Sequence, residues 1–379
     1  MKIEQIFLNR HTKNPRLKFK SFEFGPELII VFGVKEIIDE FSLHLLLREI
    51  FPSALLIGCT SAGQILNTDV SDDSVVVTLL KFNDTVVQGC MVRINDKDDS
   101  FSAGKYISSK LKDENLRHLL VLSEGLNING TELVKGLQNI LPKKISVSGG
   151  MAADGNRFEH TFVMLNDHYD SNIIAAVGFY GNKLKVGCGS FGGWEPFGPE
   201  RLVTRSVGNV VYEFDSRPAL ELYKNYLGDY AKGLPATGLL FPLSIKDNDK
   251  DTSIVRTIVA VNESTNSLVF AGEVPEHSIV RLMKTNSEKL IEGAGKAVKN
   301  CYSKSPAAPF EFALVVSCIG RKLVLKQQVE EEIETLKKSL GNSTVISGFY
   351  SYGEIAPVKY CDNSELQNQT LSLTLLSEN

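Results

Sequence analysis

Ile57-Gly58-Cys59-Thr60-Ser61-Ala62-Gly63-Gln64-Ile65 is the stretch that decides how the rest of this chain is interpreted. Related stretches follow at Ser148 to Gly155 and at Ser347 to Ile355. In all three, a short apolar run leads into Gly-x-x-(Ser/Ala)-x-Gly, where x is any residue. The six-residue pattern alone is weak, because it also occurs at 187–192 with different flanks. The flanks therefore decide whether the chain is internally repeated.

Each of the three copies follows an apolar strand, a helix and a second strand, and an aliphatic run with a threonine comes after it. The pattern predicts strands at 28–33 and 54–57 around a helix at 35–50, strands at 119–123 and 145–148 around a helix at 131–140, and strands at 312–317 and 344–346 around a helix at 328–340. The later runs are 75–80, 161–165 and 371–376. Repeated strand–helix–strand–Gly-loop–strand units predict an α/β fold of mixed β-sheets with helices.

The length of 379 residues exceeds the usual size of one core and predicts two domains. The polar, basic N-terminal arm at 1–23 is expected to form an edge or to be loosely held. The domains are expected at 24–216 and 217–379, because Asp215 to Pro218 opens a new helix. The passage 191–199, rich in Gly, Pro and aromatic residues, is either a tight connection between sheets or a shaped wall for a ligand.

The composition limits which binding partners and which cellular compartment we expect for this protein. A net charge of -4 and a pI near 6.0 give no reason to expect nucleic acid. The N-terminus does not look like a signal peptide, and no apolar run is long enough for a spanning helix, so we expect a cytoplasmic protein without membrane insertion. The six cysteines form no C-x-x-C pair, which favours reduced, mostly buried thiols.

The Gly turns and the turns after the first strands should meet at one sheet edge, because the carboxyl ends of parallel strands lie together and ligands bind there. Glycines let backbone N–H groups approach an anion or a carboxylate. Arg321 adds a two-point grip for a carboxylate. The other interpretation is that these glycines only allow tight turns. The candidate ligand-binding residues at this edge are Cys59, Thr60, Ser61, Gly63, Gly150, Asp154, Arg321, Tyr350, Ser351, Tyr352 and Glu354.

An enzyme is the alternative from another class, a hydrolase with Cys59 or Ser61 as its nucleophile. The surrounding sequence is not the Gly-x-Ser-x-Gly elbow, and no histidine is near it in the sequence. No P-loop, H-E-x-x-H or paired Cys/His set is present. We therefore expect no catalytic residues. The run 330–332 of three glutamates is expected to be a solvated helix face.

Taken in order, the motifs of this chain resemble those of the FIST sensory family, with its paired N-terminal and C-terminal FIST domains. They are 58–63, 149–155, Gly193 to Gly198, Val203-Thr204-Arg205, Gly320-Arg321, 348–354 and Asn368-Gln369-Thr370. The resemblance implies an intracellular sensor that binds a small, amino acid-like ligand. It also adds Trp194, Arg205 and Asn368 to the ligand-binding candidates.

The resemblance further implies a stand-alone sensor that relays ligand occupancy to a separate signalling partner, a histidine kinase or a cyclic-di-GMP enzyme such as a diguanylate cyclase. Some stand-alone members bind haem and sense nitric oxide, which makes haem an alternative cofactor here. Where the family commonly reads His-Asn-Gln-Thr, this chain has Gln367-Asn368-Gln369-Thr370. If the family ligates haem through that histidine, another of the six histidines of this chain would have to bind the iron here. The metal ligands are therefore unknown.

Overall fold

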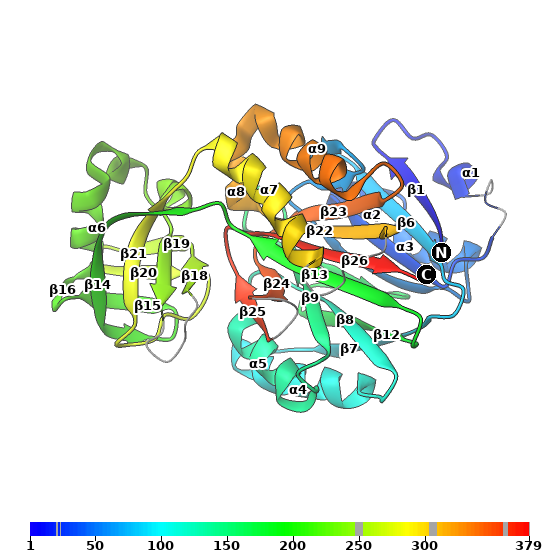
Figure 1. Ribbon diagram of the computed structural model, residues 1–379, viewed down its shortest axis with the longest axis horizontal. Coiled ribbons are helices and arrows are strands. Elements are labelled where there is room, and N and C mark those ends of the chain that lie inside the picture. The colour runs from blue at the N-terminus through cyan, green and yellow to red at the C-terminus, as the bar shows by residue number, and fades with distance from the viewer. Residues whose placement is uncertain (20–21, 23, 247–252, 303–308, 359–362, 379) are drawn as a thin grey trace.

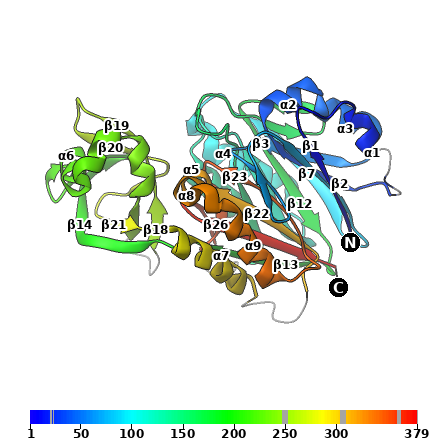
Figure 2. The same cartoon turned by 90° about the horizontal axis from the view of Figure 1, so that it is seen from above.

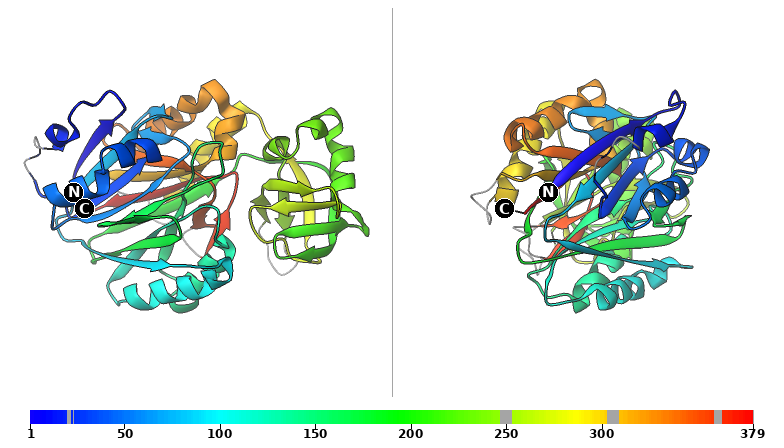
Figure 3. Two further views of the ribbon diagram at one scale, coloured as in Figure 1. Left: turned by 180° about the vertical axis from the view of Figure 1, so that it is seen from behind. Right: turned by 90° about the vertical axis from the view of Figure 1, so that its right-hand side faces the viewer.

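The computed structural model describes residues 1–19, 22, 24–246, 253–302, 309–358 and 363–378. Within them the chain forms a body of three six-stranded sheets and a smaller lobe, residues 195–284 (Figures 1 and 2). The lobe leaves and rejoins the body at the end opposite the chain termini (Figure 3). The predicted α/β class, mixed sheets with helices in two domains, is confirmed.

The body contains three repeats of one plan: edge strand, helix, strand, helix, strand, hairpin, strand. The first repeat consists of β1 (Lys2–Leu8), α1 (Pro15–Phe19), β2 (Leu28–Gly33), α2 (Lys35–Glu40), α3 (Leu43–Ile50), β3 (Leu55–Thr60), the hairpin β4 (Gln64–Leu66) and β5 (Asp69–Ser71), and β6 (Val75–Lys81). The strand β2 is apolar and buried throughout, as expected for a parallel strand that is covered on both faces.

The second repeat follows directly. It consists of β7 (Val86–Arg93), α4 (Ser100–Leu111), β8 (Leu116–Ser123), α5 (Gly130–Ile140), β9 (Ser146–Met151), the hairpin β10 (Val163–Leu165) and β11 (His168–Asp170), and β12 (Ile173–Tyr180). The helix α5 begins where the Asn129 side chain accepts a hydrogen bond from the Glu132 N–H at 3.1 Å.

The third repeat is interrupted by the lobe after its edge strand. It consists of β13 (Lys185–Phe191), α7 (Ser287–Tyr302), β22 (Phe312–Cys318), α8 (Ile319–Leu325), α9 (Val329–Leu340), β23 (Val345–Ser351), the hairpin β24 (Glu354–Pro357) and β25 (Ser364–Gln367), and β26 (Leu371–Ser377). The lobe consists of β14 (Glu195–Val207), β15 (Val210–Phe214), β16 (Arg217–Pro218), α6 (Ala219–Leu227), β17 (Leu243–Lys246), β18 (Ser253–Arg256), β19 (Ile258–Asn262), β20 (Ser267–Phe270) and β21 (Ile279–Lys284).

The hairpins join the three repeats in a cycle. The hairpin of repeat one pairs with β23 of repeat three, that of repeat two with β3, and that of repeat three with β9. In each case the first glycine of the Gly turn pairs with the incoming hairpin: Gly348 with Ile65, Gly58 with Met164, and Gly149 with Ile355. Each sheet is therefore completed by a segment of another repeat.

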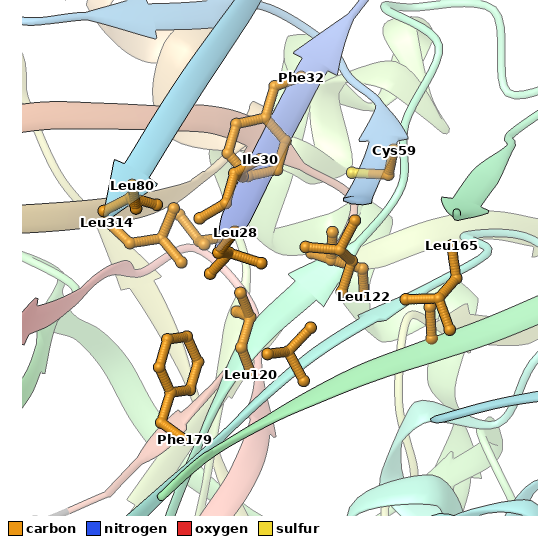
Figure 4. Close-up of a cluster of buried hydrophobic side chains, with 14 of the residues drawn as sticks. Leu28, Ile30, Phe32, Cys59, Leu80, Leu120, Leu122, Leu165, Phe179 and Leu314 are labelled. Carbon is orange, nitrogen blue, oxygen red and sulfur yellow. The ribbon is translucent and has the colours of Figure 1, made fainter. Parts of the chain in front are cut away.

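The inner faces of the three sheets share one apolar core (Figure 4). Phe32 of repeat one stacks on Phe349 of repeat three, with ring centroids 4.4 Å apart. Separate clusters pack the outer faces against helices: α2 and α3 on the first sheet, α4 and α5 on the second, and α7 and α9 on the third. The body is thus a triangular core of sheets with helices outside.

Several sequence expectations need correction. The helix expected at 35–50 is two helices, because Phe41 and Ser42 interrupt it and Ser42 has a φ of 42°. The run 161–165 is not the counterpart of 75–80; it holds the hairpin strand β10, and the counterpart of β6 is β12, which pairs antiparallel with the first strand of its repeat. Of the two possibilities for the arm at 1–23, an edge or a loosely held segment, the first holds for β1, which forms the edge of the first sheet.

The passage 191–199 leads from β13 into β14, a long strand shared by two parts of the lobe sheet. Its register shifts between Phe197 and Glu200, around the Gly-Pro pair. This passage is therefore the connection between body and lobe. The predicted division between residues 216 and 217 falls inside the lobe and stays a prediction about the domain boundary.

Candidate functional site

The three Gly turns lie against one another at the carboxyl ends of the parallel strands. The Ala62 N–H donates to the Tyr350 carbonyl at 2.9 Å, and the Ala153 N–H donates to the Thr60 carbonyl at 3.0 Å. The Met151 N–H donates to the Gly353 carbonyl at 2.8 Å. These turns use main-chain donors to hold each other, so the expectation that they present those donors to a ligand is wrong for these positions.

The first glycine of each turn has a packing role. A Cβ atom on Gly58, Gly149 or Gly348 would lie 2.3, 1.8 or 2.1 Å from a backbone carbonyl of the preceding parallel strand. No L side chain fits there without moving a strand. These three glycines therefore permit close strand packing and do not line a ligand site.

A pocket of about 370 Å³ nevertheless opens beside the turns, and we call it the Gly-loop pocket. All three repeats contribute to it: the turns of repeats one and two, and α8 after the first strand of repeat three. Its lining residues are Val34, Ser61, Ala62, Asp72, Asp154, Gly155, Asn156, Arg157, Ile319, Lys322, Leu323 and Lys326. The sequence placed Ser61 and Asp154 correctly at this shared edge.

The lining carries three cationic and two anionic side chains. Lys322 Nζ donates to the Ala62 carbonyl at 2.7 Å and pairs with Asp72. Arg157 Nη1 lies 3.0 Å from the Glu36 carboxylate. Lys326, exposed at the end of α8, has no ion-pair partner among the described residues. Arg157 Nε also lies 3.8 Å from the Asp154 carboxylate, so Lys326 is the cation of this lining that is left to pair with an anion.

Asp154 organises the wall of the pocket. Its carboxylate accepts hydrogen bonds from the N–H groups of Phe158, Glu159 and His160 at 2.9–3.0 Å, and from the Tyr352 hydroxyl. Burial acts to raise the pKa of Asp154, but these hydrogen bonds outweigh burial and lower the pKa below its usual value. Asp154 is thus an ionised, structural carboxylate.

The segment folded by Asp154 presents free donors. Within the described part of the chain, the backbone N–H groups of Gly155 and Asn156 have no hydrogen-bond partner, and the turn that they form ends at Arg157. All three residues line the pocket, and Gly155 has a φ of 75°. Successive unpaired N–H groups of this kind form anion-binding concavities. The free main-chain donors that we expected in the Gly turns are therefore found where the second Gly turn ends, in the segment 155–157.

Arg321 does not reach the pocket. Its side chain is fully buried, with Nε 3.1 Å from Glu332 Oε1, and with Nη2 donating to Glu332 and to the Leu290 carbonyl. A guanidinium used in this way cannot grip a ligand carboxylate. The expectation of a solvated glutamate face holds for Glu330 and Glu331 and is wrong for Glu332, which is 0% exposed.

The third Gly turn is closed to solvent. Tyr350, Ser351 and Glu354 are fully buried, and Ser351 donates to Glu354 at 2.8 Å. Burial raises the pKa of Glu354 to about 7, although hydrogen bonds from Ser351 and Thr370 act in the opposite direction. These residues stabilise the turn from inside.

The positions proposed for a nucleophile are poorly placed for that chemistry. Cys59 is fully buried in the central core, and burial raises its pKa well above the usual value. Ser61 Oγ lies 2.8 Å from the Gln64 side-chain amide, which is no general base. Thr60 Oγ1 accepts from the Phe162 N–H at 3.0 Å. Gly63, with a φ of 143°, and Gly150 are packed against neighbouring side chains.

The residues added through the resemblance lie elsewhere. Trp194 Nε1 donates to the Gln369 carbonyl at 2.9 Å, where the chain leaves the body for the lobe. Asn368 is buried beside it, and its Oδ1 has no hydrogen-bond partner. Arg205 is an exposed residue of the lobe, 4.8 Å from the centre of the Tyr212 ring. The structure does not bring these three to the Gly-loop pocket.

Tyr352 connects the Gly-loop pocket to a second cavity. Its ring stacks on Phe158 at 4.3 Å, and both line a cavity of about 230 Å³ between the body and the lobe residues 209, 259 and 270–273. Its hydroxyl donates to Asp154 and to the Gly155 carbonyl. One side chain thus touches both the pocket wall and the lobe junction.

Haem binding stays a prediction. None of the six histidines lines the Gly-loop pocket or the cavities at the lobe junction. His118 is buried in the core with its Nδ1 2.8 Å from Ser146 Oγ, and burial lowers its pKa to about 3. Among the described residues no group of three His, Cys, Asp or Glu side chains is arranged to hold a metal. Nor does any helix in the described ranges have the length and apolar character to cross a membrane.

The sequence interpretation missed Arg157, Lys322 and Lys326. Lys322 lies on α8 and Lys326 follows that helix with a φ of 53°, so the two lysines show no helical period in the sequence. The segment after Arg321 was not recognised as α8 because it is only 7 residues long. Arg157 gives no periodic signal, since it lies in an irregular turn.

Comparison with known proteins agrees with this architecture. Residues 27–217 match the FIST N domain and residues 219–357 match the FIST C domain. The chain is similar to Uncharacterized protein MJ1623 of Methanocaldococcus jannaschii, with 27% identity over 385 residues that cover 87% of this chain and 68% of that protein. The chain therefore belongs to the FIST family, whose domains are in general small-ligand-sensing domains.

Proposed function

We propose that this protein is a sensor that binds a small anionic ligand in the Gly-loop pocket. The observation that carries the proposal is the meeting of all three repeats around one opening that holds Lys326, which has no ion-pair partner among the described residues, and the unpaired N–H groups of Gly155 and Asn156. A carboxylate or phosphate group would accept hydrogen bonds from these N–H groups and form an ion pair with Lys326. The pocket volume of about 370 Å³ suits a metabolite-sized ligand.

Ligand occupancy would reach the lobe through Tyr352. Anchoring of 155–157 fixes the segment that Asp154 and Tyr352 hold, and Phe158 and Tyr352 form one wall of the cavity beneath the lobe. The lobe exposes the large apolar side chains of Phe197, Leu202, Val207, Tyr230 and Val259. Exposed apolar side chains of this kind mark interaction surfaces when they are contiguous. We assign the lobe to a separate signalling partner such as a histidine kinase or a cyclic-di-GMP enzyme.

Calorimetric titration with inorganic phosphate and with citrate tests the pocket. Saturable binding is expected for at least one of them, and Lys326→Gln should weaken it about fivefold or more, as the loss of one charge-assisted contact implies. Lys338→Gln on the exposed face of α9 is the matched control, because Lys338 does not line the pocket and, among the described residues, pairs with Glu334 at 3.5 Å. Equal affinities of the two variants, or no binding of either anion, would remove the support for this site.

A further inference from the structure

A second cavity of about 300 Å³ lies between the lobe and the body, and we call it the Arg256 cavity. One wall comes from the lobe, with Ile245, Ile254, Arg256, Glu273 and Pro275. The other comes from α5 and β25 of the body, with Thr131, Val134, Lys135, Gln138, Asn363, Ser364, Glu365 and Leu366. It shares only Glu273 with the cavity below Tyr352 and no residue with the Gly-loop pocket.

Arg256 is 1% exposed and lines this cavity. Its Nη1 donates to the Leu366 carbonyl at 2.8 Å, and its Nε lies 3.3 Å from the Glu273 carbonyl. Among the described residues it has no ion-pair partner, and its Nη2 makes no hydrogen bond. A buried charge costs several kcal/mol unless a counter-ion compensates it, and among the described residues no carboxylate is in direct contact with Arg256.

The residues around Arg256 leave space for its guanidinium and do not form a direct ion pair with it. Gly272 makes room for the guanidinium, since a Cβ atom there would lie 2.7 Å from Arg256 Nε. Burial lowers the pKa of Arg256 to about 10, against the opposing effect of Glu365 and Glu273, which line the same cavity. Glu273 itself is held by Lys135, 2.8 Å away. No side chain in this part of the described chain therefore neutralises Arg256 directly.

A second polar group at the cavity has no hydrogen-bond partner. Thr131 Oγ1 on α5 is buried and has no hydrogen-bond partner. It faces the same cavity as Arg256, from the body side. Val134, Ile245, Ile254 and Leu366 contribute apolar surface, and the charged side chains of Lys135, Glu273 and Glu365 also line the cavity. The cavity thus combines a buried guanidinium without a direct counter-ion among the described residues, a hydroxyl without a hydrogen-bond partner, an apolar patch and a polar rim.

We propose that the Arg256 cavity binds a small monocarboxylate with a short apolar tail. The carboxylate accepts hydrogen bonds from Arg256 and from Thr131, and the tail packs against the four aliphatic side chains. Because its walls belong to different parts of the molecule, such a ligand holds the lobe against the body. This site is separate from the Gly-loop pocket and stands whether or not that pocket binds an anion.

Titration of the full chain with hexanoate tests the proposal, with hexanamide as the uncharged analogue. Hexanoate should bind saturably, and hexanamide should bind more weakly because it cannot compensate Arg256. Thr131→Val should weaken hexanoate binding by about tenfold or more, as expected for a hydrogen bond to a charged group. It should leave the melting temperature of the free protein unchanged or raised, since the hydroxyl has no protein partner.

Two further variants separate the site from general effects. Arg256→Lys keeps a positive charge and should retain weak binding if it folds, whereas Thr335→Val on α9, outside the cavity, is the matched threonine control. Absence of hexanoate binding to the folded wild type overturns the proposal. Unchanged affinity in Thr131→Val also overturns it. Loss of binding in Lys326→Gln, with Thr131→Val unaffected, would assign hexanoate to the Gly-loop pocket instead.

Discussion

The regions around Arg321 and Arg256 both bury a complete arginine side chain, and they differ in what compensates the charge. Arg321 lies in the body against Glu332, whose other carboxylate oxygen is 3.4 Å from the hydroxyls of Ser317 and Tyr350. Arg256 lies at the lobe junction, and among the described residues only backbone carbonyls accept its hydrogen bonds. Burial of a charge therefore indicates a binding site only where its partner is missing from the chain.

The largest expected effect is the loss of the partner of Arg321. Glu332→Gln removes the buried carboxylate charge and should destabilise the protein by about 3–5 kcal/mol, because the guanidinium is left uncompensated. Urea unfolding followed by circular dichroism measures this change. Glu331→Gln, one residue away and exposed, should change the free energy of unfolding by less than about 0.5 kcal/mol. Similar values for the two variants would show that the ion pair does not stabilise this region.

The pH dependence of stability tests the same region through Glu354. Its pKa is raised from 4.5 to about 7 in the folded protein, so the folded state binds a proton that the unfolded state has lost between these values. The contribution of Glu354 to the free energy of unfolding is therefore present at low pH and is lost as the pH rises through about 7. The loss is roughly 3 kcal/mol, because each unit of pKa difference corresponds to about 1.4 kcal/mol. Glu354→Gln should gain stability relative to the wild type between pH 5 and pH 8. A difference between the two proteins that does not vary with pH contradicts this assignment.

A smaller effect is expected when the uncompensated arginine is replaced. Arg256→Met loses hydrogen bonds to two carbonyls but also removes an unpaired buried charge, so we expect a cost of about 1–2 kcal/mol. The same urea experiment provides the comparison with Glu332→Gln. A cost as large as that of Glu332→Gln would mean that Arg256 is compensated within the protein, and the contrast between the two arginines would disappear.

The exposed Arg205 is the reference for the stability effects of the two buried arginines. The side chain of Arg205 is 61% exposed, with Glu213 at 3.8 Å and the Tyr212 ring beneath it. Arg205→Ala should therefore change the free energy of unfolding by less than about 0.5 kcal/mol. A loss above 1 kcal/mol in the same assay would show that surface contacts in the lobe contribute more than burial predicts.

The repeats were predictable because hydrophobic periodicity and turn glycines are local signals. The strand–helix–strand order around 28–57, 119–148 and 312–346 is observed, and the three turns meet as expected. The exchanged hairpins were not predictable, because strands of three residues such as β4 and β10 are too short to show a period. Their pairing depends on contacts between distant repeats.

The candidate site was predictable only in part for the same reason. Ser61 and Asp154 follow strands, so topology places them at the sheet edge. The burial of Arg321 depends on Glu332, which is 11 residues further along the chain and on another helix. Arg256 carries no sequence signal at all, since its isolation results from how the lobe lies against the body.

The central claim is that the segment 155–157 at the meeting point of the repeats binds an anion. The most direct measurement is the amide chemical shift of Gly155, Asn156 and Arg157 during titration with inorganic phosphate or citrate. These amide signals should move and saturate together, and Lys326→Gln should shift the midpoint to higher concentration. Signals at 155–157 that stay in place while either anion saturates another part of the protein would contradict it.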